Sequence, residues 1–342
     1  MRRRTRLGLA VLAALVVLAG AYTAYWFVVA GEIKDRVDAW AQSERSDKIE
    51  VSWRGITITG FPIAFRVEVD RAALRDNAVN PPPDLRISSL AGTAQPWDFA
   101  DWRIQAKAGF SVELAGAGER TPAMLTAKTA DGVVSIGSGG DWKLWLRLED
   151  AAVEAEDRVQ ISSADGWVIV PSRPPQNHVD PAIGLAWNLR HVRLPISVGP
   201  LGDTIEQLDF DVTVRGGFSG GKLAQAAAAW RDAGGTIELD NLDLRWGGLG
   251  AVATGTVALD QELQLIGGFS GAVQGYDKVL TALVQSGHMR AADAGLARIA
   301  LTMLAKAGPD GKPEIRTAFT IQNGQMFLGP AKLGRAPHLS WE

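Results

Sequence analysis

The sequence predicts a mainly β fold of the α+β class, in which an N-terminal transmembrane helix is followed by long, curved antiparallel meander sheets and a few packed helices. Three observations predict it. The segment from Leu7 to Ala30 contains no charged residue. Downstream, apolar and polar residues alternate over many segments, which is typical of strands with one apolar face. Residues that favour tight turns separate these segments.

The N-terminal segment predicts a membrane anchor. As a helix, Leu7 to Ala30 would be roughly 36 Å long, enough to cross a hydrocarbon core of about 30 Å. The arginines before Leu7 favour the cytoplasmic side, because moving them across a membrane costs free energy. We therefore expect residues 1–30 to form a basic cytoplasmic tip and a single-pass anchor in the bacterial inner membrane. Residues 31–342 would form a periplasmic β-rich region.

Two other interpretations of this segment remain open. A cleaved signal peptide would use Leu7 to Leu18 as its apolar region and would be cut after Ala21. Against cleavage, aromatic residues typical of the membrane boundary of a retained helix continue the apolar run. These residues are Tyr22, Tyr25, Trp26 and Phe27. A buried core helix is disfavoured, because it would leave four arginines at one end and no amphipathic face.

Composition excludes several classes of function. The net charge is -3, with 35 basic and 38 acidic residues, and no basic stripe with interleaved aromatics appears, so nucleic acid is not an expected partner. The chain contains no cysteine, which excludes disulfides and thiol catalysis. The four histidines are scattered without metal-ligand spacing. We expect no metal and no cofactor.

The first half of the periplasmic region predicts long strands. Ile33, Val37 and Trp40 have helical spacing, so the anchor helix is expected to continue as a stalk. Gly60-Phe61-Pro62 predicts a turn or bulge, and Asp131-Gly132 predicts a hairpin turn. Predicted strands cover residues 49–53, 56–58, 65–69, 85–87, 102–114, 142–148 and 167–170. The clearest is one unbroken strand from Trp102 to Leu114.

The second half follows a proline-rich segment. Residues 171–181 contain four prolines and are the best boundary between two halves, 31–175 and 182–342, of one continuous unit. Gly216-Gly217-Phe218-Ser219-Gly220 recurs as Gly267-Gly268-Phe269-Ser270-Gly271, and each copy is predicted to turn from a strand into a helix. Helices are predicted at 222–232, 276–285 and 292–306. A final hairpin would turn at Asn323-Gly324.

Little in the sequence indicates catalysis. Gly217-Phe218-Ser219-Gly220-Gly221 has the letters of a nucleophile elbow, so a serine hydrolase that uses Ser219 is a remote alternative. The recurrence of the pattern at residues 267–271 favours a structural turn. We therefore expect no enzymatic activity and no catalytic residues.

Several glycine-rich and aromatic motifs resemble those of the bacterial family called domain of unknown function 2125. They are Trp53-Arg54-Gly55, Gly60-Phe61-Pro62, Leu242 to Gly250, Gly255 to Asp260 and Phe327-Leu328-Gly329-Pro330. The similarity spans nearly the whole chain beyond the anchor. More distantly, an N-terminal span followed by Gly-Phe-Pro and meandering strands resembles AsmA-type envelope proteins. That resemblance implies a sheet whose apolar groove holds lipids.

The excess of apolar strand faces over helices that could cover them predicts a hydrophobic groove. The residues expected to line it are Trp102, Ile104, Phe110, Val112, Trp142, Leu144 and Leu146. The leading hypothesis is an anchored envelope protein that binds or shelters lipid. The alternative is a structural or adaptor protein that binds other envelope proteins and no small ligand.

Overall fold

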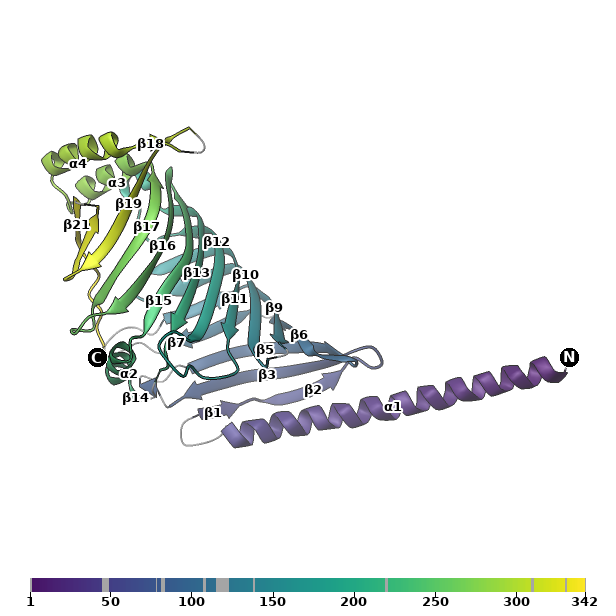
Figure 1. Cartoon of the computed structure of the whole chain (residues 1–342). Coiled ribbons are helices and arrows are strands. Elements are labelled where there is room, and N and C mark those ends of the chain that lie inside the picture. Colours follow the sequence, from purple (N-terminus) through teal and green to yellow (C-terminus); the bar gives the residue numbers. More distant parts are fainter. Residues whose placement is uncertain are drawn as a thin grey trace.

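A computed structural model describes residues 2–44, 49–77, 79–80, 84–106, 109–114, 123–137, 139–218, 221–308, 311–329 and 331–341. Most of these residues belong to one antiparallel sheet, in which consecutive strands are neighbours from β9 to β13 and from β15 to β17, whereas β1 and β2 both pair with β3 and β6 pairs with β9 (Figure 1). The predicted mainly β fold, with a meander of long strands and a few helices, is confirmed.

The sheet has a first and a second half in chain order. The first half comprises β1 (Ile49–Ser52), β2 (Gly55–Thr59), β3 (Phe65–Asp76), β5 (Asp84–Gln95), β6 (Asp98–Ala106), β7 (Phe110–Leu114), β8 (Ala123–Ala127), β9 (Thr129–Ile136), β10 (Trp142–Glu154) and β11 (Arg158–Val170). The second comprises β12 (Pro181–Arg193), β13 (Thr204–Arg215), β15 (Thr236–Trp246), β16 (Leu249–Leu259), β17 (Leu265–Gln274), β18 (Lys306–Ala307), β19 (Pro313–Gln322), β20 (Gln325–Leu328) and β21 (Ala331–Arg335). β4 (Val79–Asn80) and β14 (Gly221–Lys222) form a separate parallel pair. The proline-rich segment connects β11 to β12, which pair directly, so both halves share one sheet.

The N-terminal helix α1 (Arg2–Glu44) is continuous, so the predicted anchor and the predicted stalk are one helix. Its C-terminal part lies along β1 and β2, and its N-terminal part extends beyond the sheet (Figure 1). Among the described side chains, the segment Leu15–Ala39 is long and apolar enough to cross a membrane. The side chains before Leu15 lie outside the described residues.

The three predicted downstream helices are confirmed. They are α2 (Leu223–Asp232), α3 (Tyr276–Gln285) and α4 (Ala291–Leu304), and a short 3-10 helix, η1 (Gly199–Leu201), packs against α3. α3 and α4 lie together at the C-terminal end of the sheet (Figure 1). The predicted turn at Asn323-Gly324 is also confirmed, with both residues at positive φ between β19 and β20.

Three predicted features are wrong. Asp131-Gly132 lies inside β9 and does not turn the chain; a Cβ at Gly132 would lie 2.6 Å from the carbonyl oxygen of Trp145, so this glycine serves close packing within the sheet. The second copy of the repeat, residues 267–271, does not turn from a strand into a helix but lies inside β17. Gly267 also serves close packing within the sheet, because a Cβ there would lie 2.4 Å from the carbonyl oxygen of Thr256. The predicted strand from Trp102 to Leu114 is interrupted between β6 and β7, next to Gly109 at φ 89°.

Candidate functional site: an apolar trough

One face of the sheet is apolar from strand to strand. Residues paired across neighbouring strands lie on the same face, and the register therefore defines rows that cross the sheet. One such row runs through Trp102, Val134, Leu144, Val168, Leu185, Val212, Leu239, Gly255, Phe269 and Phe319. The face is therefore a continuous apolar surface.

The opposite face is mixed, because it contains polar rows and also the paired rings of Trp145 and Trp167. One of its rows runs through Gln105, Asp131, Arg147, Asp165, Asn188, Asp209 and Asp243. The side chains bond to one another: Nε2 of Gln105 donates to Oδ1 of Asp131 at 2.9 Å, and Arg190 forms an ion pair with Asp209. The hydrogen bond to Asp209 raises the pKa of the Arg190 guanidinium, against the lowering effect of burial. This polar row suits contact with water.

A crease crosses the sheet and folds the apolar face inward. On every second strand it contains a residue at positive φ: Arg71 (50°), Gly109 (89°), Asp150 (49°) and His191 (49°). The register places Ser88, Lys128, Ser162 and Glu206 in the same line on the intervening strands. These eight residues define the crease. Asp150 and Lys128, on neighbouring strands, form an ion pair at 3.5 Å within it.

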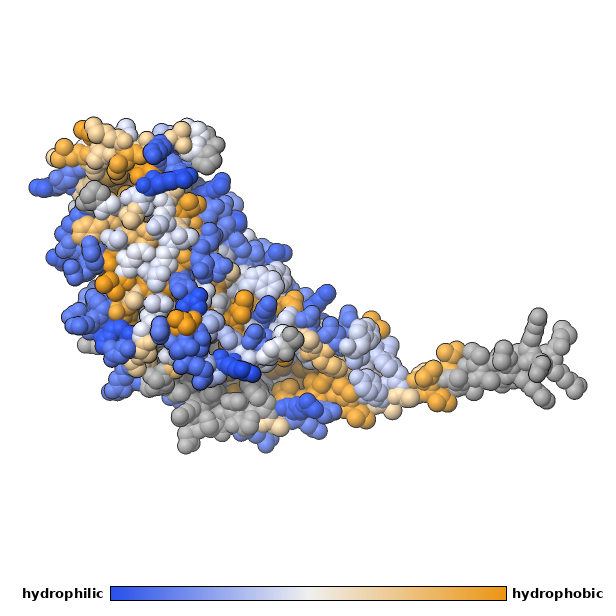
Figure 2. Space-filling model, viewed as in Figure 1, coloured by the Kyte–Doolittle hydropathy of each residue, from blue (hydrophilic) through white to orange (hydrophobic). Residues whose placement is uncertain are grey.

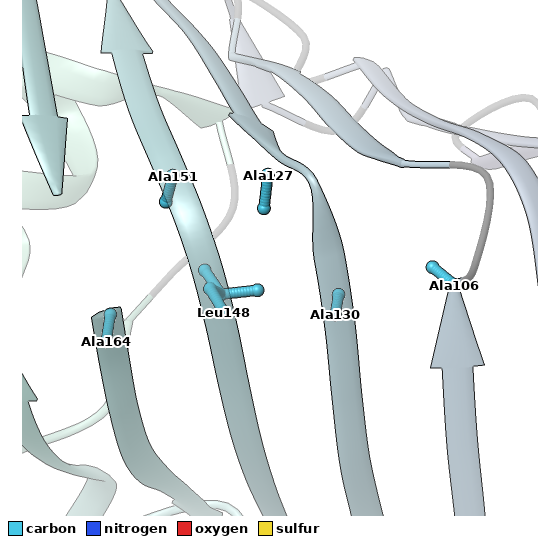
Figure 3. Close-up of a cluster of buried hydrophobic side chains, with 6 residues drawn as sticks. All are labelled: Ala106, Ala127, Ala130, Leu148, Ala151 and Ala164. Atoms are coloured by element: carbon cyan, nitrogen blue, oxygen red, sulfur yellow. The ribbon is translucent and has the colours of Figure 1, made fainter. Parts of the chain in front are cut away.

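The crease reverses the alternation of side chains. Leu148 and Ala151 are three residues apart, yet both belong to one buried cluster, because the left-handed residue Asp150 lies between them. The cluster comprises Ala106, Ala127, Ala130, Leu148, Ala151 and Ala164, and Figure 3 shows Leu148 extending toward Ala130. Side chains crowd together on the inner side of a sharp bend, so alanine is favoured there. The polar side chains Arg71, Lys128, Asp150 and His191 are exposed.

We call the inner side of this folded sheet the trough. With strands about 4.8 Å apart, the crease extends for roughly 34 Å from β3 to β13. The exposure of side chains on the inner face rises with their distance from the crease. Ala164, beside the crease on β11, is 2% exposed, whereas Trp142, at the far end of β10, is 53% exposed. Trp142, Ile136 and Val170 form the rim of the trough. The same face is therefore core at the crease and surface at the rim.

Aromatic rings lie over glycines inside the trough. A Cβ at Gly255 would lie 2.5 Å from Cδ1 of Phe269, and a Cβ at Gly166 would lie 2.6 Å from Cδ2 of Trp187. Trp102 similarly contacts the position above Gly92, where a Cβ would lie 3.3 Å from Cε3. Glycine on a strand exposes backbone, and a cross-strand aromatic ring covers it. The rings thus complete the apolar inner face.

The two ends of the trough are capped. At the N-terminal end, Trp26 of α1 stacks on Phe65 of β3, with ring centroids 5.0 Å apart. At the C-terminal end, α3 and α4 pack Leu280 and Leu301 against Ile315 of β19 and leave an apolar cavity of about 350 Å³. Among the described residues, α1 contacts β1 and β2, α2 contacts β14, α3 contacts β16 and α4 contacts β19, and no helix makes comparable contact with the central strands β6 and β9 to β12.

The predicted groove residues divide between the two walls of the trough. Trp102 and Ile104 on β6, and Leu144 and Leu146 on β10, line one wall, and Trp142 lies at its rim. Val112 lies on β7 beyond the crease, paired with Leu125 of β8. Phe110 begins β7, but its side chain lies outside the described residues, as does the whole of Ser219. The expected groove along one long strand is replaced by a trough that runs across many strands.

The crease was missed by sequence reasoning, although the sequence contains a signal. Two polar residues separate two apolar residues at seven of the eight crossings, as in Leu148-Glu149-Asp150-Ala151 and Leu189-Arg190-His191-Val192, and Gly109 is the exception. One such slip is a common bulge, but its recurrence along successive strands indicates a fold line. For chemistry, the described residues contain no group of three or more His, Cys, Asp or Glu side chains able to hold a metal ion.

Comparison with known proteins identifies the family but no close relative of known function. No curated protein and no solved structure matches the chain. The likeness to AsmA-type envelope proteins therefore stays a prediction. A family model described as an uncharacterized protein conserved in bacteria, DUF2125, matches residues 26–337. This match covers both caps and the whole trough, and the protein belongs to the DUF2125 family.

Proposed function

We propose that this protein is anchored in the bacterial inner membrane by the N-terminal part of α1, and that its trough binds acyl chains of lipids on the periplasmic side. The observation that carries the proposal is the half-buried apolar surface between the two caps, which includes Leu144, Val168 and Leu185. Contiguous apolar surface in contact with water costs free energy, and large patches of this kind mark binding sites.

Lipid is favoured as the occupant because the trough begins beside the anchor. Aromatic rings lead from α1 into it: Trp26 stacks on Phe65, Phe65 contacts Phe99, and Phe99 contacts Trp102. Trp26 and Phe65 are buried, and Phe99 is exposed beside them, so a bilayer at α1 would supply acyl chains next to Phe99. The crease is roughly 34 Å long, which accommodates an extended acyl chain. The apolar row through Leu144, Val168 and Leu185 contains no charged residue, so its chemistry matches that of an acyl chain.

The test uses the full-length protein in cells fed a fatty acid with a photoactivatable diazirine. After illumination, mass spectrometry locates the modified peptides. Modification of α1 reports lipid around the anchor, whereas modification of the strand segments 130–148 and 164–189 reports lipid in the trough. We expect both. Modification of α1 alone would overturn lipid binding by the trough and leave the anchor in place.

A second candidate function is that of an adaptor, and one observation favours it. The outer side of α4 exposes Leu296, Ile299, Met303 and Leu304, with Met303 80% exposed. An exposed apolar helix face fits a groove on a partner protein. Crosslinking in intact cells separates the candidates, because an adaptor should give one dominant protein partner through α4 and no lipid in the trough.

A further inference from the structure

The first contacts between α1 and the sheet occur at two hairpin turns. The hydroxyl of Tyr22 donates to the carbonyl oxygen of Pro62. The hydroxyl of Tyr25 donates to the carbonyl oxygen of Pro96 at 3.1 Å, and Nε1 of Trp26 donates to that of Ala64 at 3.1 Å. Trp26 is buried. The turns between β2 and β3 and between β5 and β6, which we call the hairpin tips, are therefore fixed to one short segment of α1.

The hairpin tips expose large apolar side chains. Ile63 is 71% and Trp97 is 70% exposed, and Phe61 and Phe99 are exposed beside them. Phe27 of α1 is exposed on the same side and stacks on Phe61 at 5.8 Å between ring centroids. In Figure 2, hydrophobic surface lies on both sides of the point where α1 leaves the sheet, and the surface between is close to neutral in hydropathy.

The hairpin tips contain little charge. Gly60-Phe61-Pro62-Ile63-Ala64 contains none, and Pro96-Trp97-Asp98-Phe99 contains one carboxylate, which accepts a hydrogen bond from the backbone N–H of Ala100 at 3.1 Å. An exposed, aromatic and nearly uncharged surface is typical of the boundary between lipid and water.

The length of α1 decides how close the hairpin tips come to a bilayer. Residues 7–21 precede the first sheet contact and span only about 22 Å at 1.5 Å per residue, whereas the hydrocarbon core is about 30 Å thick. The missing distance of about 8 Å must come from residues 22–27, which are the residues fixed to the hairpin tips. Any tilt of the helix increases the shortfall.

We propose that the hairpin tips insert into the bilayer that α1 spans and seat the N-terminal end of the trough on the membrane surface. The inference rests on the proposed anchoring. Phe61, Ile63, Trp97 and Phe99 enter the interfacial layer together with Phe27. Membrane lipid then lies directly beside the exposed ring of Phe99, which contacts Trp102 in the trough, without crossing water.

The absence of cysteine from the chain allows a direct test with the full-length protein. Single variants Ile63→Cys and Trp97→Cys are labelled with an environment-sensitive fluorophore in vesicles of phosphatidylethanolamine and phosphatidylglycerol. Matched controls are Val16→Cys in the anchor and Ile196→Cys, an exposed residue after β12. All four side chains are exposed, so labelling should not unfold the protein.

The expected result is a blue shift of emission at Ile63 and Trp97, with quenching by lipids that carry a nitroxide near the headgroup. Val16 should be quenched by nitroxides deeper in the acyl chain, and Ile196 should show neither effect. Quenching at Val16 with water-like emission at Ile63 and Trp97 would overturn the seating and leave the anchor intact. No quenching at Val16 would overturn the anchor and, with it, the seating.

Discussion

The crease and the rim lie on one apolar face, yet they are built from different residues. Five of the six clustered residues at the crease are alanines and all are buried, whereas the rim has Ile136, Trp142 and Val170 with substantial exposure. A bend leaves no space for large side chains on its inner side, and an opening leaves large side chains in water. One apolar face thus supplies both a buried core and an exposed apolar surface.

The largest effect is expected at the crease. Ala164→Asp would place an unpaired carboxylate in a 2% exposed position and should lower the free energy of unfolding by about 3 kcal/mol or more. Ser162→Asp, an exposed crease residue two positions away, should change it by less than about 0.5 kcal/mol. Denaturant titration in detergent micelles measures both. Equal, small effects would mean that water reaches the crease and that no compact core exists there.

A smaller effect is expected from the backbone of the crease. Asp150 has φ 49°, a conformation that costs a β-branched residue about 1–2 kcal/mol, so Asp150→Val should destabilise the fold by that amount. Asp150→Gly removes the same ion pair to Lys128 but tolerates the conformation, and should be close to neutral. The same titration compares them with Glu149→Val, an exposed neighbour. A neutral Asp150→Val would show that the fold does not depend on the left-handed residue.

The smallest effect on stability is expected at the rim. Trp142→Ser removes a large side chain that is 53% exposed and should change the free energy of unfolding by less than about 0.5 kcal/mol. The variant should nevertheless reduce diazirine modification of β10. A loss of stability like that of Ala164→Asp would show that Trp142 is covered, and the distinction between rim and crease would disappear.

The sequence predicted elements well where local chemistry decides them. Alternation predicted most strands, helical spacing predicted α4, and Asn323-Gly324 predicted its turn because both residues accept positive φ. Turns were wrongly predicted at Gly132 and Gly267, where glycine allows the backbone of a neighbouring strand to approach closely. The residues next to these glycines in the sequence do not reveal which strand that is.

The candidate site was predicted in part for a similar reason. Five of the predicted groove residues, Trp102, Ile104, Trp142, Leu144 and Leu146, share the apolar wall because alternation assigns a face to each strand. The fold line could not be assigned from one strand, because Asp150 and His191 are not glycines and give no local sign of positive φ. Only the register among strands shows that these positions are aligned.

The central claim is that lipid occupies the inner face of the sheet and not its outer face. Leu146 and Arg147 are adjacent on β10 and lie on opposite faces, with Leu146 in the trough and Arg147 in the polar row. A photoreactive amino acid placed at either position in cells, followed by mass spectrometry of the crosslinked products, tests the claim directly. The account predicts phospholipid adducts at position 146 and none at position 147. Protein adducts alone at position 146, or equal lipid adducts at both positions, would contradict it.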